Sequence, residues 1–212
     1  SHKIFTHEQK LTSMRSNCVP FLKATVHHEL IPGHHLMMYM NDRYNTHRKG
    51  YGTPFLGEGW PLYWELLLYK MGFATESENR YGFLFWRMHR CARIMIVLGF
   101  HIGKISIQDC IDLVIKRVGH DEHAGTSQVR WLIAGDLSLY GAAYMLGGLQ
   151  LMGLRTELVD SGGMSDKEFH DRILEVNLMP IYLARALLTG RKLARDEKLE
   201  WRFYDRVLEG RT

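Results

Sequence analysis

The stretch HHELIPGHH at residues 27–35 constrains the fold more than any other part of this chain of 212 residues. Four of the twelve histidines fall within it, together with one glutamate and a Pro-Gly pair. Proline has no backbone N–H and biases the preceding residue away from helical geometry, while glycine adopts conformations closed to other residues. A helix that runs from about Val19 toward Tyr44 is therefore predicted to be disturbed at Pro32 and Gly33.

The spacing of the histidines indicates what this disturbance of the helix would do. The helical form of a hydrolytic zinc site is H-E-x-x-H, in which the second histidine lies one turn after the first. His28 and Glu29 supply the first half, but position 32 is proline. On a straight helix with about 100° per residue, His34 would point roughly 120° away from His28, and His35 would lie about 10 Å further along the axis. The Pro-Gly pair is predicted to form a bulge or kink that returns His34 to the second ligand position.

The third ligand must come from another element, and the stretch LGEGWPLYWE contains two glutamates that suit the site. Glu58 is the leading candidate, because it lies at the start of a predicted helix in which Pro61 suits the first turn. Glu65 lies seven residues on and shares the same helical face, so it is predicted to hydrogen-bond a ligating histidine. The two glutamates could exchange these roles.

The remainder of the chain predicts an all-α fold. Apolar residues recur at helical spacing without sustained alternation, and a content of 46% hydrophobic and 24% charged residues is ordinary for a globular protein. We expect a single helical domain over residues 1–212. Besides the interrupted first helix, helices are predicted around residues 60–70, over 77–103, from the capping boxes at Ser106 and Ser165, from Pro180 to Leu188 ahead of Gly190, and over 196–208.

Charge excludes some classes of function. The formal net charge is +4, but 27 basic and 23 acidic residues are mixed along the chain, which is typical of solvated helix faces and not of a nucleic-acid-binding stripe. Arg87, Arg90 and Arg93 recur every three residues and are expected to face solvent or to be paired. We therefore expect no nucleic-acid partner.

The uncharged stretch at residues 137–154 is near the lower limit for crossing a bilayer. Because it contains four glycines and two tyrosines, we expect a helix buried inside protein and no membrane partner for this part of the chain. The first ten residues contain no signal-peptide hydrophobic region. The odd number of cysteines, without a C-x-x-C pair, predicts buried thiols at Cys18, Cys91 and Cys110.

Four stretches carry a resemblance to a known family. HELIPGHHL at 28–36 matches the pattern H-E-x-x-P-G-H, and EGWPLYWE at 58–65 is similar to E-G-W-A-L-Y-x-E; LYGAAYMLGGLQLMGLR at 139–155 and FHDRILEVNLMPIYLAR at 169–185 continue the match. The sequence thus resembles the bacterial domain-of-unknown-function family 885, which includes candidate lipoproteins and is similar to gluzincin metallopeptidases. Pro61 departs from the small residue usual in the family. The resemblance implies the C-terminal catalytic part of a longer chain, with a zincin-like catalytic region.

Carried over by position, the resemblance implies a zinc site with assigned roles. His28, His34 and Glu58 would be the zinc ligands, and Glu29 would be the base that activates a water molecule. The resemblance also implies either a cytoplasmic or an exported protein.

Other residues are expected to contact the substrate or to line its pocket. Tyr144 would stand where related peptidases place a tyrosine that hydrogen-bonds the oxyanion, and Tyr140, one turn earlier, is the substitute candidate. Arg130 is the first choice, ahead of His120 and His123, for a contact with substrate or developing charge. We expect His35 and His27 to line the pocket and Tyr63 to pack.

The predicted function is zinc-dependent hydrolysis of a peptide or related small amide, with one zinc ion per chain and Glu29 moving the proton. Two alternatives stay open: a metal-binding helical domain without catalysis, in which a ligand such as His35 closes the site, and a helical interaction or membrane-associated domain. A site of this composition accepts other divalent metals as well. Besides substrate, the expected partners are an additional N-terminal region or a second copy of the chain.

Overall fold

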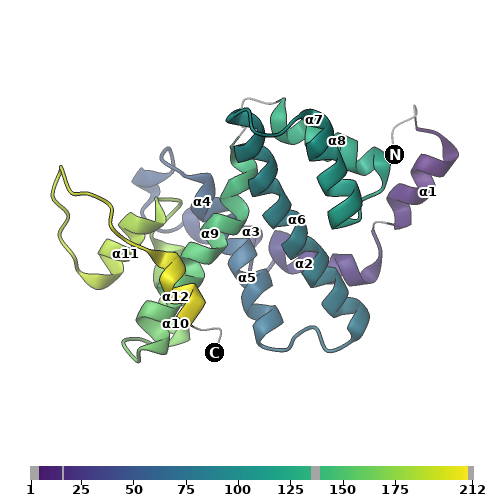
Figure 1. Cartoon of the computed structure of the whole chain (residues 1–212). Coiled ribbons are helices and arrows are strands. Elements are labelled where there is room, and N and C mark those ends of the chain that lie inside the picture. The colour runs from purple at the N-terminus through teal and green to yellow at the C-terminus, as the bar shows by residue number, and fades with distance from the viewer. Residues whose placement is uncertain (1–4, 16, 135–138, 210–212) are drawn as a thin grey trace. The chain divides into compact units, whose positions relative to one another are not determined.

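The computed structural model describes residues 5–15, 17–134 and 139–209, and these residues contain helices and no strand (Figure 1). The all-α prediction is therefore confirmed. In chain order the elements are α1 (His7–Arg15), α2 (Val19–Glu29), α3 (His34–Asn41), the 3-10 turn η1 (Thr46–Arg48), α4 (Pro54–Gly57), α5 (Gly59–Lys70), α6 (Ser77–His101), α7 (Ile107–Asp112), the π-helical η2 (Leu113–Val118), α8 (Glu122–Ile133), α9 (Tyr140–Arg155), the π-helical η3 (Thr156–Asp160), α10 (Asp166–Glu175), α11 (Ile181–Thr189) and α12 (Phe203–Glu209).

Most helix starts follow the sequence signals. Ser106 and Asp109 form the reciprocal capping box of α7, and the Ser165 hydroxyl accepts the Glu168 N–H at the start of α10. The predicted last helix is wrong over residues 196–202, because α12 begins only at Phe203. There the Glu197 carboxylate accepts the Ala194 N–H at 3.2 Å and the Tyr182 hydroxyl at 2.9 Å, and these side-chain bonds hold a turn in place of helix.

The chain divides into two compact units, which are described separately. The first unit comprises Ser1–Val26 and Leu68–Met145, and the second comprises His27–Leu67 and Leu146–Thr212. The expectation of a single domain stays a prediction.

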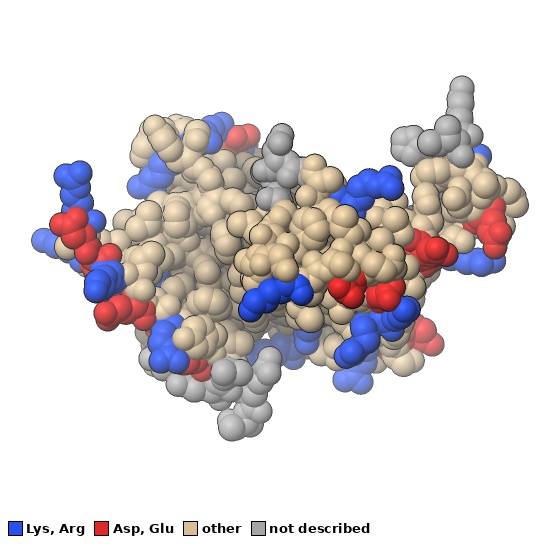
Figure 2. All heavy atoms as spheres, turned by 45° about the horizontal axis from the view of Figure 1, so that its top comes forward, with Lys and Arg blue, Asp and Glu red and all other residues tan. Residues whose placement is uncertain are grey.

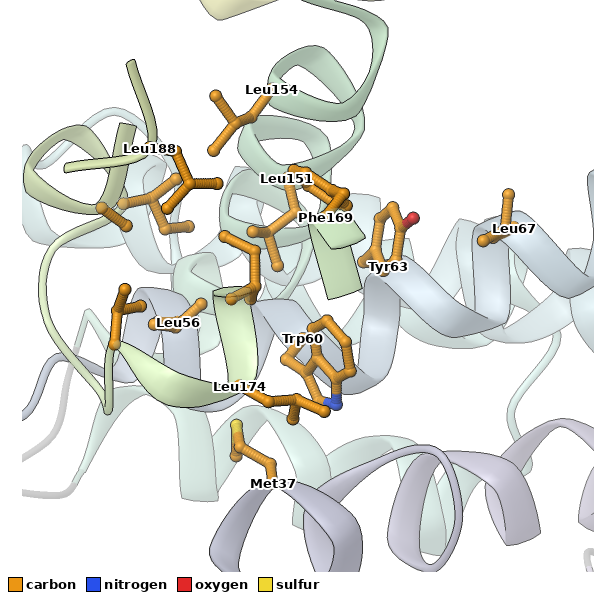
Figure 3. Packing of buried hydrophobic residues seen from close by; sticks show 14 residues of the cluster. Met37, Leu56, Trp60, Tyr63, Leu67, Leu151, Leu154, Phe169, Leu174 and Leu188 are labelled. Atoms are coloured by element: carbon orange, nitrogen blue, oxygen red, sulfur yellow. The ribbon is translucent and has the colours of Figure 1, made fainter. Parts of the chain in front are cut away.

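The second unit has a core built on α5, α9 and α10. Trp60 and Tyr63 are almost fully buried and pack with Phe169 and Leu151 (Figure 3). Burial raises the pKa of Tyr63 and lowers that of His170, so a neutral hydroxyl and a neutral imidazole share a hydrogen bond of 2.7 Å between the tyrosine oxygen and Nε2. The expected packing role of Tyr63 is thus confirmed, and a buried polar pair orients its ring.

Two glycines let α5 and α9 cross at close range inside this core. A Cβ added to Gly147 would lie 1.9 Å from the Phe55 carbonyl oxygen, and one added to Gly59 would lie 2.6 Å from the Gly147 carbonyl carbon. Neither position accepts a side chain unless the backbones separate. The crossing fixes the junction of α4 and α5, where Glu58 lies.

The first unit packs α6 against η2, α7 and α8. Arg90 and Arg93 are 5% and 7% exposed, so of the two expected alternatives, facing solvent is wrong for both, and having a partner holds. Their guanidinium groups lie over the Tyr144 ring at 4.7 and 4.9 Å from its centroid, and Arg93 also donates to Gln128. Planar guanidinium groups stack on aromatic rings, and this compensates part of the cost of burying their charge.

The remaining expectations concern hydropathy, thiols and charge. Among the described residues, no helix is both long and apolar enough to span a membrane. Residues 137 and 138 of the uncharged stretch lie outside the described residues, and the stretch continues as α9. Cys110 is buried as expected, but Cys18, in the loop just before α2, and Cys91, on the outer face of α6, are exposed. On the face drawn in Figure 2, acidic and basic side chains are interspersed without a field of a single sign.

Candidate metal centre

The helix that carries the first histidine pair ends where the sequence predicts. α2 stops at Glu29, α3 starts at His34, and the intervening turn contains a cis Ile31–Pro32 peptide. The N–H groups of His35 and Leu36 both point back to the Leu30 carbonyl oxygen, at 3.1 and 3.4 Å. The predicted disturbance is therefore confirmed, although it is a full break between two helices and not a kink within one.

Gly33 makes this turn possible in two ways. Its φ of −77° and ψ of −133° are in neither the α nor the β region that residues with a side chain favour, as expected for glycine at this position. In addition, a Cβ at Gly33 would lie 1.9 Å from the His28 carbonyl oxygen and 2.4 Å from that of His27. The absence of a side chain lets the start of α3 fold back onto the end of α2.

Gly33→Ala is expected to disrupt this turn. Because the added carbon meets backbone on the end of α2, the turn must open, at a cost of about 1–3 kcal/mol in the free energy of unfolding. Gly57→Ala is the matched control, since a Cβ there meets nothing within 4 Å. Urea denaturation of the metal-free proteins measures the difference, and equal stability of the two variants would contradict the steric account.

Three donor side chains meet at the break between α2 and α3. His34 Nε2 lies 3.3 Å and His28 Nε2 lies 3.6 Å from Glu58 Oε2, and the ligand atoms of all three residues lie within 4.8 Å of one another. Within the described part of the chain, this is the only group of three or more potential ligands with such spacing. The ligand atoms of a tetrahedral zinc site, with bonds of about 2.0–2.1 Å, are separated by roughly 3.3 Å. The donor set therefore fits a zinc ion with little rearrangement.

Burial differs among the three donors in a way that matters for access. His28 and Glu58 are 3% and 7% exposed, whereas the side chain of His34 is 24% exposed. A buried carboxylate and imidazole favour a site of low dielectric, in which a cation is held strongly. The His34 side leaves the group open to solvent, where a fourth ligand would enter.

Glu65 orients the most deeply buried histidine. Its Oε1 lies 2.7 Å from Nδ1 of His28, and both side chains are buried. With Nδ1–H donated to this carboxylate, Nε2 of His28 carries its lone pair toward Glu58 and His34. The geometry thus places Glu58 among the donors and Glu65 behind one of them.

Glu65→Gln is expected to weaken metal binding without changing the number of sites. The amide keeps the size of the side chain but loses the charge that raises the basicity of His28, and such changes cost about 10–100-fold in affinity. Glu200→Gln, at an exposed position of the same unit, is the control. Competition with a chromophoric chelator measures both affinities; unchanged affinity in the Glu65 variant would exclude this role.

Trp60 supports the turn and was missed in the sequence. Its indole N–H donates to the Pro32 carbonyl oxygen across 2.7 Å, from a position two residues after Glu58. The only signal available was the tryptophan in the E-G-W pattern, and no spacing argument pairs it with a proline carbonyl. This bond links the turn between His28 and His34 to α5, the helix that also carries Glu65.

The other predicted residues of this region lie beside the donors. Glu29 and His35 directly follow His28 and His34 in sequence, and both are exposed. His27 Nδ1 lies 3.2 Å from the Ile31 carbonyl oxygen, inside the turn. The roles of Glu29 as base and of His35 and His27 as pocket residues stay predictions.

The residues predicted to contact the oxyanion or substrate belong to the first unit. Tyr140 and Tyr144 lie on α9 with ring centroids 5.7 Å apart, and Arg130 is exposed on α8. His120 Nε2 lies 2.8 Å from His89 Nδ1, and the His123 ring packs edge-on against Phe5. Their assigned roles stay predictions.

Fold and site together define an all-α protein with a candidate metal centre of two histidines and a glutamate. The chain belongs to the DUF885 family, described as bacterial proteins of unknown function, because the family model matches residues 7–188. A comparison with curated proteins gives no match.

Two solved structures are similar to the chain. A candidate lipoprotein from Colwellia psychrerythraea is 24% identical with a TM-score of 0.76, and the match covers 84% of this chain and 31% of that one. A candidate lipoprotein of unknown function from Shewanella oneidensis is 18% identical with a TM-score of 0.79, covering 88% of this chain and 35% of that one. At these identities the likeness shows the fold alone. The chain spans about a third of the length of both structures.

Proposed function

We propose that this chain is a zinc-dependent hydrolase of peptide or related small amide bonds. The observation that supports the proposal is the convergence of His28, His34 and Glu58, whose donor atoms lie within 4.8 Å of one another. The exposed Glu29 directly follows His28 in the sequence. Two imidazoles and one carboxylate are the ligand set of one class of catalytic zinc site, which keeps its fourth position for water or substrate.

In the proposed reaction, different residues of the chain would bind the metal and transfer the proton. His28, His34 and Glu58 would hold the ion, and Glu65 would keep His28 in the tautomer that can ligate. A zinc ion bound there supplies Lewis acidity, which polarises an amide carbonyl and lowers the pKa of water. Glu29 accepts one proton from the attacking water on a carboxylate oxygen while the new C–O bond forms. It then returns that proton to the nitrogen as the C–N bond breaks, so that acid and amine are released.

The alternative of a purely structural metal site receives less support. A structural zinc site is closed by four protein ligands, whereas the group in the described residues contains three. His35, the residue considered as a fourth ligand, is exposed and is not a member of the group. The partial exposure of His34 also favours a position that solvent reaches.

Elemental analysis combined with a peptide screen tests the proposal. The purified chain is expected to contain about one zinc ion and to cleave members of a mixed peptide library, as followed by mass spectrometry. Cleavage should cease after removal of metal by a chelator and return on addition of zinc. Bound zinc without cleavage of any peptide or small amide would favour the structural site, and absence of zinc binding would refute the proposal.

A further inference from the structure

The solvent-facing side of α6 in the first unit is apolar along most of the helix. Between Arg80 and His101, every exposed residue of this helix is apolar. The exposed fraction is 62% for Tyr81 and 58% for Met95. It is 44% for Leu84 and Met88 and 43% for Leu98. We name this set the α6 stripe: Tyr81, Leu84, Met88, Cys91, Met95, Leu98 and, just after the helix, Ile102.

This stripe is a second apolar face, additional to the one that builds the core. Phe83, Ile96 and Val97 on the inner face are at most 2% exposed, so the packing of α6 within its own unit is already satisfied. A helix of a globular protein normally presents polar residues on its opposite side. Isolated exposed apolar residues need no explanation, but a continuous row of them marks an interaction site.

The spacing of the stripe indicates what binds to it. Its members follow one another at intervals of three and four residues along seven positions, which is the repeat of helices that pair lengthwise. Tyr81, Leu84, Met88 and Cys91 also line a surface groove together with Phe85 and Arg87. Grooves between such residues receive the side chains of a facing helix.

We propose that the α6 stripe is an interface with a second copy of this chain. In a twofold pair, each copy presents the same patch, so the patch must be complementary to itself. The order Leu84, Met88, Cys91, Met95, Leu98 is the same when it is read from either end, with Cys91 in the middle. Every exposed residue of α6 between Tyr81 and Leu98 is uncharged. Arg87, which lines the groove, is half-buried, and its guanidinium lies over the Tyr69 ring at 4.7 Å from the centroid.

The area of the stripe is sufficient for a stable contact. With side chains of about 150–200 Å² each, the exposed fractions leave roughly 600 Å² of apolar surface on one copy. Two copies would then bury about 1,200 Å², which is the lower end of the range for specific interfaces. A moderate affinity that depends on protein concentration follows from this size.

Sedimentation velocity of the full chain over a range of concentrations tests the interface. The chain is expected to form a dimer, and Met95→Glu should raise its dissociation constant by at least about 100-fold, because the symmetric pair would bury two unpaired carboxylates. Met71→Glu is the matched control, since Met71 is 70% exposed but lies outside the stripe. Circular dichroism checks that both variants keep their helices.

Crosslinking gives a second readout that places the contact. In a Cys18→Ser background, Cys91 is the only exposed cysteine of the described residues, because Cys110 is buried. A twofold axis at the centre of the stripe brings the two Cys91 residues together, so mild oxidation should yield a disulfide-linked dimer that Cys91→Ser abolishes. A monomer at all concentrations, or a dimer that neither Met95→Glu nor Cys91→Ser affects, would overturn the proposal. The test requires neither metal nor substrate.

Discussion

Replacing Glu29 by glutamine is expected to leave about one zinc ion bound per chain and to reduce turnover by about 100- to 10,000-fold. Glutamine has nearly the shape of glutamate but accepts no proton at neutral pH, so the water and the leaving amine both lose their proton carrier. Glu29 is exposed at the end of α2 and is not one of the three donors, so its replacement should not disturb the site. Parallel measurement of metal content and of peptide cleavage separates the two effects.

The control for this experiment is a glutamate of the same unit with no proposed role. Glu200→Gln should retain both zinc and turnover, since Glu200 is exposed and is not a member of the donor group. Full activity of the Glu29 variant would refute its role as base, even if the metal centre itself is correct. Loss of zinc in that variant would instead assign Glu29 a part in holding the ion.

His34→Ala is expected to remove the metal from the chain. Two donors remain, and a third protein ligand is needed for a stable zinc site with one open position. At a zinc concentration of 100 times the dissociation constant, the wild-type chain should gain about 2.7 kcal/mol of stability, and the variant should gain almost none. Elemental analysis and thermal unfolding with and without zinc measure these two consequences.

His35→Ala is the matched control, because His35 is the neighbouring histidine, is exposed and does not belong to the donor group. It should bind zinc like the wild-type chain. If His35→Ala loses the ion and His34→Ala keeps it, the fold of the turn between α2 and α3 is assigned incorrectly. If neither variant affects binding, the ion lies elsewhere.

The break at Pro32 and Gly33 could be predicted because proline and glycine act locally, through a missing N–H and a missing side chain. The same holds for the helix starts at Ser106 and Ser165, where the cap and its partner are three residues apart. Glu58 could be nominated as a partner of the histidines because it lies about thirty residues downstream of them at the start of a predicted helix. Most of the helices and the candidate donor residues could therefore be predicted from signals between residues close together in the sequence.

Contacts between distant segments could not be predicted in this way. The bond from Trp60 to the Pro32 carbonyl joins residues 28 positions apart and depends on how α5 docks against the turn. The burial of Arg90 and Arg93 depends on Tyr144, which lies on another helix and supplies the ring that they cover. Periodicity along one helix indicates a polar row but not the aromatic ring that packs on it.

One short segment supports the candidate centre at three points: Glu58 contributes a donor, Trp60 ties the turn, and Glu65 orients His28. We expect these three contacts to form or separate together, because they extend from a single helix and the residue that precedes it. Metal affinity in this protein should therefore report the population of molecules in which α5 is docked. A substitution that loosens α5 from the opposite side of the crossing, such as one at Gly147 on α9, would then lower the apparent affinity for zinc without altering any donor residue.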